Sequence, residues 1–169
     1  TTSNFKKRSQ YLTGDPRFTS VKKGTKNIVY LWARKEFQNI SKCYDCGIPV
    51  VKPRHVSKNI LIMDFEGKDG KPENTLLESE IDENDYHQSI ELISDLFKKA
   101  KFVHGDFSEY NIFKTKNGLK LFDLGSAVDT THPNTMNFLK RDINNITNFF
   151  VKRGLTVENP TDILERITK

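Results

Sequence analysis

The order of secondary-structure signals along the chain predicts an α+β fold that is mostly helical after about residue 75. Apolar residues recur at helical spacing in several segments, and short apolar runs between turn residues predict two strands and a later hairpin. Strands and helices do not alternate regularly, so a doubly wound parallel sheet is not expected. The length of 169 residues suits a single domain.

The first half of the chain is expected to contain a loop, one helix and two strands. Residues 13–27 are rich in glycine, proline and lysine and predict a loop, whereas residues 27–44 carry an apolar stripe and predict a helix. Short strands are expected over residues 50–56 and 60–65. The second is apolar without alternation, which is typical of a strand covered on both faces. Residues 66–72 predict a linker.

Helices dominate the second half. Regular apolar spacing predicts one over residues 83–99 and a longer one over residues 133–153, and a short helix is expected over residues 160–168. The buried stripe of the long helix is predicted to consist of Met136, Leu139, Ile143, Ile146 and Phe150.

Composition and charge exclude several classes of protein. Hydrophobic residues make up 36% of the chain and aromatic residues 11%, which is too much for a disordered chain. No run of about 18 apolar residues is present, so no membrane span is expected. The net charge of +5 permits an acidic partner such as RNA or a nucleotide without requiring one. Cys43 and Cys46 lack nearby partner ligands for zinc and are expected to be ordinary thiols.

Three oxygen-bearing side chains are predicted to converge beside a hairpin. Asp106 and Asn111 lie on one loop, and Asp123 ends a hairpin that begins just after Asn111. Asn117 and Gly118 are a strong turn signal because both tolerate positive φ, so the chain folds back and returns Asp123 to the vicinity of Asn111. Carboxylate and amide oxygens are hard ligands, suited to Mg²⁺ and poorly suited to zinc.

Phosphoryl transfer from ATP uses such a set. A carboxylate and a carboxamide hold Mg²⁺ against the phosphates, while a second carboxylate orients the attacking nucleophile and accepts its proton. The alternative is that these side chains only cap turns. Their combination, His-Gly-Asp at 104–106, Asn111 and Asp-Leu-Gly at 123–125, favours the catalytic interpretation. His104 is expected to brace the loop by hydrogen bonds.

The set is similar to the catalytic residues of protein kinases, and the wider sequence resembles the first subfamily of the Rio family of atypical kinases. The resemblance covers nearly the whole chain. The further motifs that carry it lie at residues 32–39 (WARKEFQN), 48–53 (IPVVKP), 108–112 (SEYNI), 132–134 (HPN) and 138–150 (FLKRDINNITNFF).

The resemblance implies a protein-kinase-like two-lobed fold, with a truncated N-lobe over residues 1–65 and a mostly helical C-lobe over residues 66–169. It further implies that Asp106 is the catalytic-loop aspartate and that Asn111 and Asp123 bind Mg²⁺. Asp123 would also accept the γ-phosphate transiently, as an aspartyl-phosphate.

The resemblance also implies an ATP site. Glu36 would pair with the ATP-binding lysine, and the segment Met63, Asp64, Phe65 and Glu66 would be the hinge that meets adenine, with Met63 lining the pocket behind. Core packing of Met63 and Phe65, and a solvated charge at Glu36, are the simpler interpretations.

The sequence departs from the family in lacking a Gly-rich phosphate loop and an Ala-x-Lys strand. We therefore expect that it is a piece of a longer protein without the start of the N-lobe, and that by itself it binds ATP poorly.

The function implied is that of an ATP- and Mg²⁺-dependent serine/threonine kinase or ATPase, working in the cytoplasm on maturation of the small ribosomal subunit. Its partner would be the pre-ribosomal particle, both protein and rRNA. One alternative is a small-molecule phosphotransferase of the aminoglycoside or choline kinase type, which the short stretch after Asp123 disfavours. Another is a non-catalytic, ATP-gated module that binds the pre-ribosome.

Overall fold

The structure, a computed structural model, describes residues 25–169 and confirms the α+β class. The loop predicted over residues 13–27 lies outside the described residues except at its end, which is already helical. The elements in chain order are helix α2 (Thr25–Asp45), strands β1 (Pro53–Ser57), β2 (Ile60–Met63), β3 (Gly67–Lys68) and β4 (Lys71–Pro72), 3-10 helix η3 (Leu76–Glu78), helix α3 (Glu83–Lys98), strands β5 (Phe102–Val103), β6 (Ile112–Thr115), β7 (Gly118–Leu121) and β8 (Val128–Asp129), and helices α4 (Thr135–Lys152) and α5 (Pro160–Thr168).

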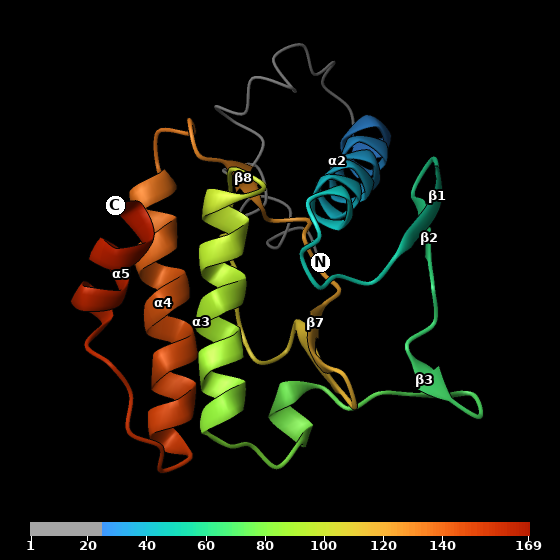
Figure 1. The fold of residues 1–169 in the computed structure, drawn as a ribbon. Coiled ribbons are helices and arrows are strands. Elements are labelled where there is room, and N and C mark those ends of the chain that lie inside the picture. The colour runs from blue at the N-terminus through green and yellow to red at the C-terminus, as the bar shows by residue number, and fades with distance from the viewer. Residues whose placement is uncertain (1–24) are drawn as a thin grey trace.

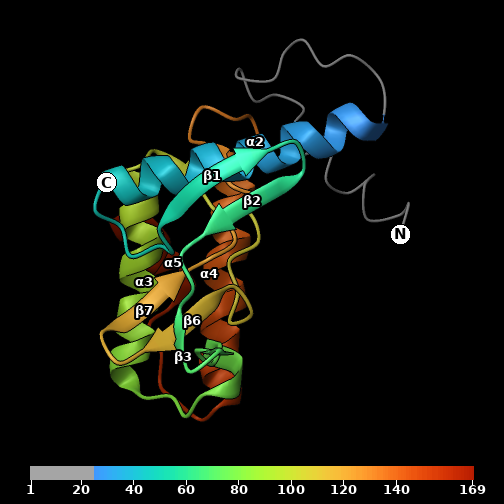
Figure 2. The same ribbon diagram turned by 90° about the vertical axis from the view of Figure 1, so that its right-hand side faces the viewer.

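Helices α3, α4 and α5 pack side by side, and α2 crosses over one end of the α3–α4 pair (Figures 1 and 2). The helix ends follow the sequence signals. Asp82 accepts a hydrogen bond from Asp85 N at the start of α3, and Asn159 caps α5 just before Pro160. No helix within residues 25–169 is long and apolar enough to cross a membrane.

The predicted buried stripe of α4 is wrong at its first position. Met136 is 43% exposed, whereas Thr135 and Phe138 are buried. Leu139, Ile143, Ile146 and Phe150 are buried as predicted. The face of α4 that packs inward therefore begins at Thr135, and Met136 lies one residue further around the helix, about 100° away.

Strand β2 is a member of a two-stranded antiparallel sheet rather than a strand covered on both faces. It pairs with β1 in a register that joins Ser57 to Ile60, and the hairpin lies beside α2 (Figure 2). Ile60 and Ile62 are 59% and 49% exposed. The prediction failed because an apolar run does not reveal whether a second layer covers the strand. Residues 66–72, predicted as a linker, form the small β3–β4 hairpin.

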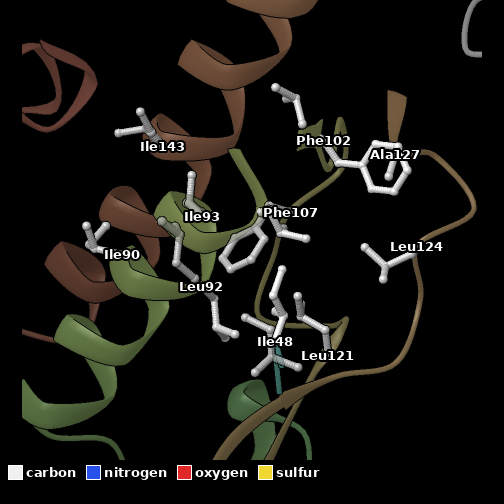
Figure 3. Close-up of a cluster of buried hydrophobic side chains, with 14 of the residues drawn as sticks. Ile48, Ile90, Leu92, Ile93, Phe102, Phe107, Leu121, Leu124, Ala127 and Ile143 are labelled. Atoms are coloured by element: carbon white, nitrogen blue, oxygen red, sulfur yellow. The ribbon is translucent and has the colours of Figure 1, made fainter. Parts of the chain in front are cut away.

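The β6–β7 hairpin is confirmed. Thr115 pairs with Gly118 and Ile112 with Leu121, and Gly118 adopts a φ of +111°, which favours glycine. The core lies between this hairpin, α3, α4 and the segment after β7 (Figure 3). Phe107, Leu121 and Leu124 are fully buried in it, so the backbone on either side of the predicted catalytic residues is anchored in the core.

Candidate active site

Two residues of α4 hold the loop that carries Asp106 by hydrogen bonds to its backbone. The buried carboxylate of Asp142 accepts hydrogen bonds from the backbone N–H of Gly105, at 2.7 Å, and of Phe107, at 3.1 Å. The guanidinium of the adjacent Arg141 donates to the carbonyl of Gly105. These hydrogen bonds fix the backbone of the residues before and after Asp106. The side chain of Asp106 itself is exposed.

Burial raises the pKa of Asp142 to about 7, although the two backbone N–H groups and the nearby Arg141 favour its charged form. Arg141 and Asp142 lie within a motif that carries the family resemblance, but the sequence predicts no role for either residue. The available signal was an ionisable residue next to Ile143, in the middle of the apolar stripe of a helix.

Hydrogen bonds to backbone groups connect Asn111 with Asp106 and with Phe122, the residue before Asp123. Its side-chain Nδ2 donates to the carbonyl of Asp106 at 2.9 Å, and Phe122 N donates to the carbonyl of Asn111 at 3.2 Å. The second bond extends the β6–β7 pairing, so Asp123 follows directly after the residue opposite Asn111. Because Nδ2 is used to hold the loop, the carboxamide oxygen Oδ1 is the atom that could bind a cation.

Asp123 is exposed at the start of a turn, and its Oδ1 accepts a hydrogen bond from Gly125 N at 3.0 Å. Within the described part of the chain, no three His, Cys, Asp or Glu side chains form a cluster able to hold a metal ion. The Asn111–Asp123 pair nevertheless fits Mg²⁺, which proteins usually bind through one or two carboxylates while phosphate and water oxygens complete the shell.

His104 packs against the loop by ring contact. Its ring is buried and meets Phe107 edge-on with centroids 5.5 Å apart. Neither ring nitrogen reaches hydrogen-bonding geometry with a described partner, although the backbone of Asp123 lies close by. Burial lowers the pKa of His104, and the negative charges of Asp123 and Asp106 oppose that shift.

The predicted hinge begins at the end of β2. Met63 is half-buried and packs against the core. Asp64 N donates to the carbonyl of Lys52 at 2.9 Å, and hydrogen bonding to Arg54 lowers the pKa of the Asp64 carboxyl.

The next two residues of the segment differ in exposure. Phe65 is 62% exposed, and the carboxylate of Glu66 pairs with Lys120 of β7 at 2.7 Å. Glu66 thereby connects the predicted hinge segment to the same hairpin that leads into Asp123. Glu36 is half-buried on α2, which reaches the turn after Asp123 through its neighbour Lys35.

Comparison with known proteins identifies the family of the chain. A family model described as "RIO domain" matches residues 1–163. The chain belongs to the RIO domain family. The RIO-type serine/threonine-protein kinase Rio1 of Thermoplasma acidophilum is 37% identical, and the alignment covers 99% of this chain and 89% of that protein. The serine/threonine-protein kinase rio1 of Dictyostelium discoideum is 35% identical over 97% of this RIO chain and 30% of its own length.

The structural comparison shows the protein-kinase-like fold of this family. The Rio2 kinase of Chaetomium thermophilum, solved as an ADP/Mg²⁺-phosphoaspartate complex, has a TM-score of 0.66 and is 25% identical; the match covers 82% of the RIO chain and 44% of that protein. The chain spans only 30%, 43% and 33% of three curated eukaryotic relatives, so their full activity is not carried over with the family name.

Proposed function

We propose that this RIO chain is part of an ATP- and Mg²⁺-dependent phosphotransferase that phosphorylates serine or threonine or hydrolyses ATP. The observation that carries the proposal is the backbone bond between Phe122 and Asn111, which returns Asp123 to the end of the loop held by Asp142. Two exposed carboxylates and one amide oxygen then share one end of the hairpin. Relatives named serine/threonine-protein kinase support the same class.

In this proposal Asp106 orients the attacking group and accepts its proton, and Asn111 Oδ1 and the Asp123 carboxylate hold Mg²⁺. The cation, when bound, neutralises charge on the phosphates. Glu36 and the segment from Met63 to Glu66 contribute to nucleotide binding. The division into a partial N-lobe over residues 1–65 and a C-lobe over residues 66–169 belongs to the same proposal.

The ATPase route runs through Asp123. A carboxylate oxygen of Asp123 attacks the γ-phosphorus, the bond from that phosphorus to the β–γ bridging oxygen breaks, and ADP leaves with the bond electrons. Water then hydrolyses the acyl phosphate and restores the carboxylate. The relative solved with a phosphoaspartate supports this route for a protein of the same family.

Substitution of Asp106 and Asp123 in the full-length protein tests the proposal. Asp106→Ala should abolish turnover and spare nucleotide binding. Asp123→Asn should lose Mg²⁺-dependent nucleotide binding and the acid-stable, hydroxylamine-labile phosphoenzyme formed from γ-labelled ATP. Asp162→Asn, which removes an exposed carboxylate on α5, is the matched control and should change neither readout. Turnover that survives Asp106→Ala would remove the catalytic role of that residue.

We further propose that the protein acts in the cytoplasm on the maturing small ribosomal subunit, with the pre-ribosomal particle as its partner. The net charge of +5 is compatible with an RNA-containing partner. Purified particles should stimulate turnover or be bound in an ATP-dependent manner. Rapid phosphorylation of an aminoglycoside or choline would instead favour the small-molecule kinase, and ATP-dependent binding of the particles without any turnover would favour the non-catalytic module.

A further inference from the structure

Helix α2 contacts the turn after Asp123 through a buried lysine. Lys35 is completely buried, and its ammonium donates to the carbonyl of Gly125 at 2.8 Å and to the carbonyl of Ala127. These acceptors lie 90 and 92 residues away along the chain. Burial of an ammonium is expensive unless hydrogen bonds satisfy it, so the two carbonyls stabilise α2 in this position.

Asn39 makes the equivalent contact one turn further along α2. Its Nδ2 donates to the carbonyl of Leu124 at 2.8 Å and to that of Ala127 at 3.1 Å, and its side chain is also fully buried. Residues spaced by four lie on one face of a helix. Lys35 and Asn39 together therefore bind the carbonyls of Leu124, Gly125 and Ala127, and we call these two residues the α2 latch.

A third residue of α2, Trp32, packs against the same turn. A Cβ atom at Gly125 would lie 2.7 Å from Trp32 Nε1, which leaves no room for a side chain there. The indole lies three residues before Lys35 in the sequence. The helix thus contacts the turn both by close packing of the indole and by hydrogen bonds.

The latch reaches Asp123 through Gly125. The carbonyl of Gly125 accepts from Lys35, and the N–H of Gly125 donates to Asp123 Oδ1 at 3.0 Å. The N–H of Gly125 shares its peptide plane with the carbonyl of Leu124, which accepts from Asn39, so rotation of that peptide away from Asn39 would also move the N–H that orients the Asp123 carboxylate. The turn has a bond of its own, from Ala127 N to the carbonyl of Leu124 at 3.1 Å, and the latch holds both of those residues.

We infer that Lys35 and Asn39 are positioning residues that hold residues 124–127 in the conformation in which Asp123 binds the divalent cation. The inference rests on the proposed function, because it takes Asp123 to be a ligand of that cation.

Lys35→Met in the full-length protein tests the inference, with Asn39→Ala as a second variant. Lys42→Met is the matched control, since Lys42 is an exposed lysine on the same helix whose ammonium lies over the Phe102 ring. The probe is Mn²⁺ with ADP, detected by electron paramagnetic resonance. Each latch variant should lower Mn²⁺ affinity about tenfold, as loss of residues that orient a metal ligand generally does.

Amide hydrogen exchange gives a readout that does not depend on the nucleotide. Each latch variant should speed exchange at Gly125 and Ala127 by about tenfold, while amides in α3 and α4 keep their protection. Lys42→Met should match the wild type in both measurements. If Lys35→Met fails to fold, Asn39→Ala decides the question.

The outcomes separate the inference from the proposed function. If Asp123→Asn weakens Mn²⁺ binding but the latch variants bind as tightly as the wild type, the latch is only structural and the inference is wrong. If Asp123→Asn also binds as tightly as the wild type, or if the wild type does not bind Mn²⁺ with ADP, the proposed role of Asp123 fails and the inference falls with it.

Discussion

Asp142→Asn tests how α4 supports the loop that carries Asp106. The Asp142 side chain is 1% exposed and holds the N–H groups of Gly105 and Phe107. Burial raises its pKa from 3.8 to about 7. Asparagine has nearly the same shape but cannot ionise, so the variant removes the titration without opening a cavity.

The expected magnitude follows from the pKa difference between the folded and unfolded chain. The folded state holds the proton more tightly, so the stabilisation is greatest below the unfolded value of 3.8, is lost as the pH rises toward about 7, and is constant above that. Each pKa unit corresponds to about 1.4 kcal/mol. Between pH 5 and pH 8 the free energy of unfolding should therefore fall by about 2–3 kcal/mol through this one group.

Urea unfolding at these two pH values measures the effect in the wild type and in Asp142→Asn, followed by circular dichroism. The stability of the wild type relative to the variant should decrease by about 2–3 kcal/mol from pH 5 to pH 8, while contributions from other groups cancel in the difference. Asp162→Asn removes an exposed carboxylate and should give a wild-type pH profile. Wild-type and Asp142→Asn profiles that stay parallel would refute the reasoning and show that the two N–H bonds outweigh burial.

Three further experiments test other contacts. Gly125→Ala should destabilise the fold by about 1–3 kcal/mol and shift the emission of Trp32, since the added Cβ would lie 2.7 Å from Trp32 Nε1; unchanged stability and emission would contradict that contact. A thiol reagent at pH 8 should modify Cys46 rapidly and Cys43 only on unfolding, because burial raises the pKa of the Cys43 thiol to about 12; a rapid phase that persists in Cys46→Ser would show the opposite. Tyr86→Phe should cost about 0.5–1.5 kcal/mol in urea unfolding, because Glu158 N donates to the Tyr86 hydroxyl at 3.1 Å, whereas Tyr110→Phe at an exposed position should be neutral; equal losses in both would argue against this bond.

The parts of the fold that the sequence predicted are those set by local periodicity and turn chemistry. The helices α3 and α5 lie at the expected residues, because their apolar spacing and end signals are contained within each segment. The return of Asp123 toward Asn111 followed from one turn, in which Gly118 adopts the expected positive φ. The family resemblance, confirmed by the RIO domain match, rested on short motifs spread along nearly the whole chain, each of which can be read without knowledge of the packing.

The supports of the candidate site were decided by the tertiary structure. Asp142, Lys35 and Asn39 are polar residues on helices, and each is buried because it binds backbone groups at least 35 residues away in the sequence. A backbone N–H or carbonyl has the same chemistry at every residue, so no sequence pattern can show which one a buried side chain will meet. The exposed face of β2 has a related origin, because burial of a strand depends on which layers pack against it. The sequence by itself determined the local elements and the residues able to do chemistry, and only the packing of α2 and α4 against the two loops decided which side chains hold those residues in place.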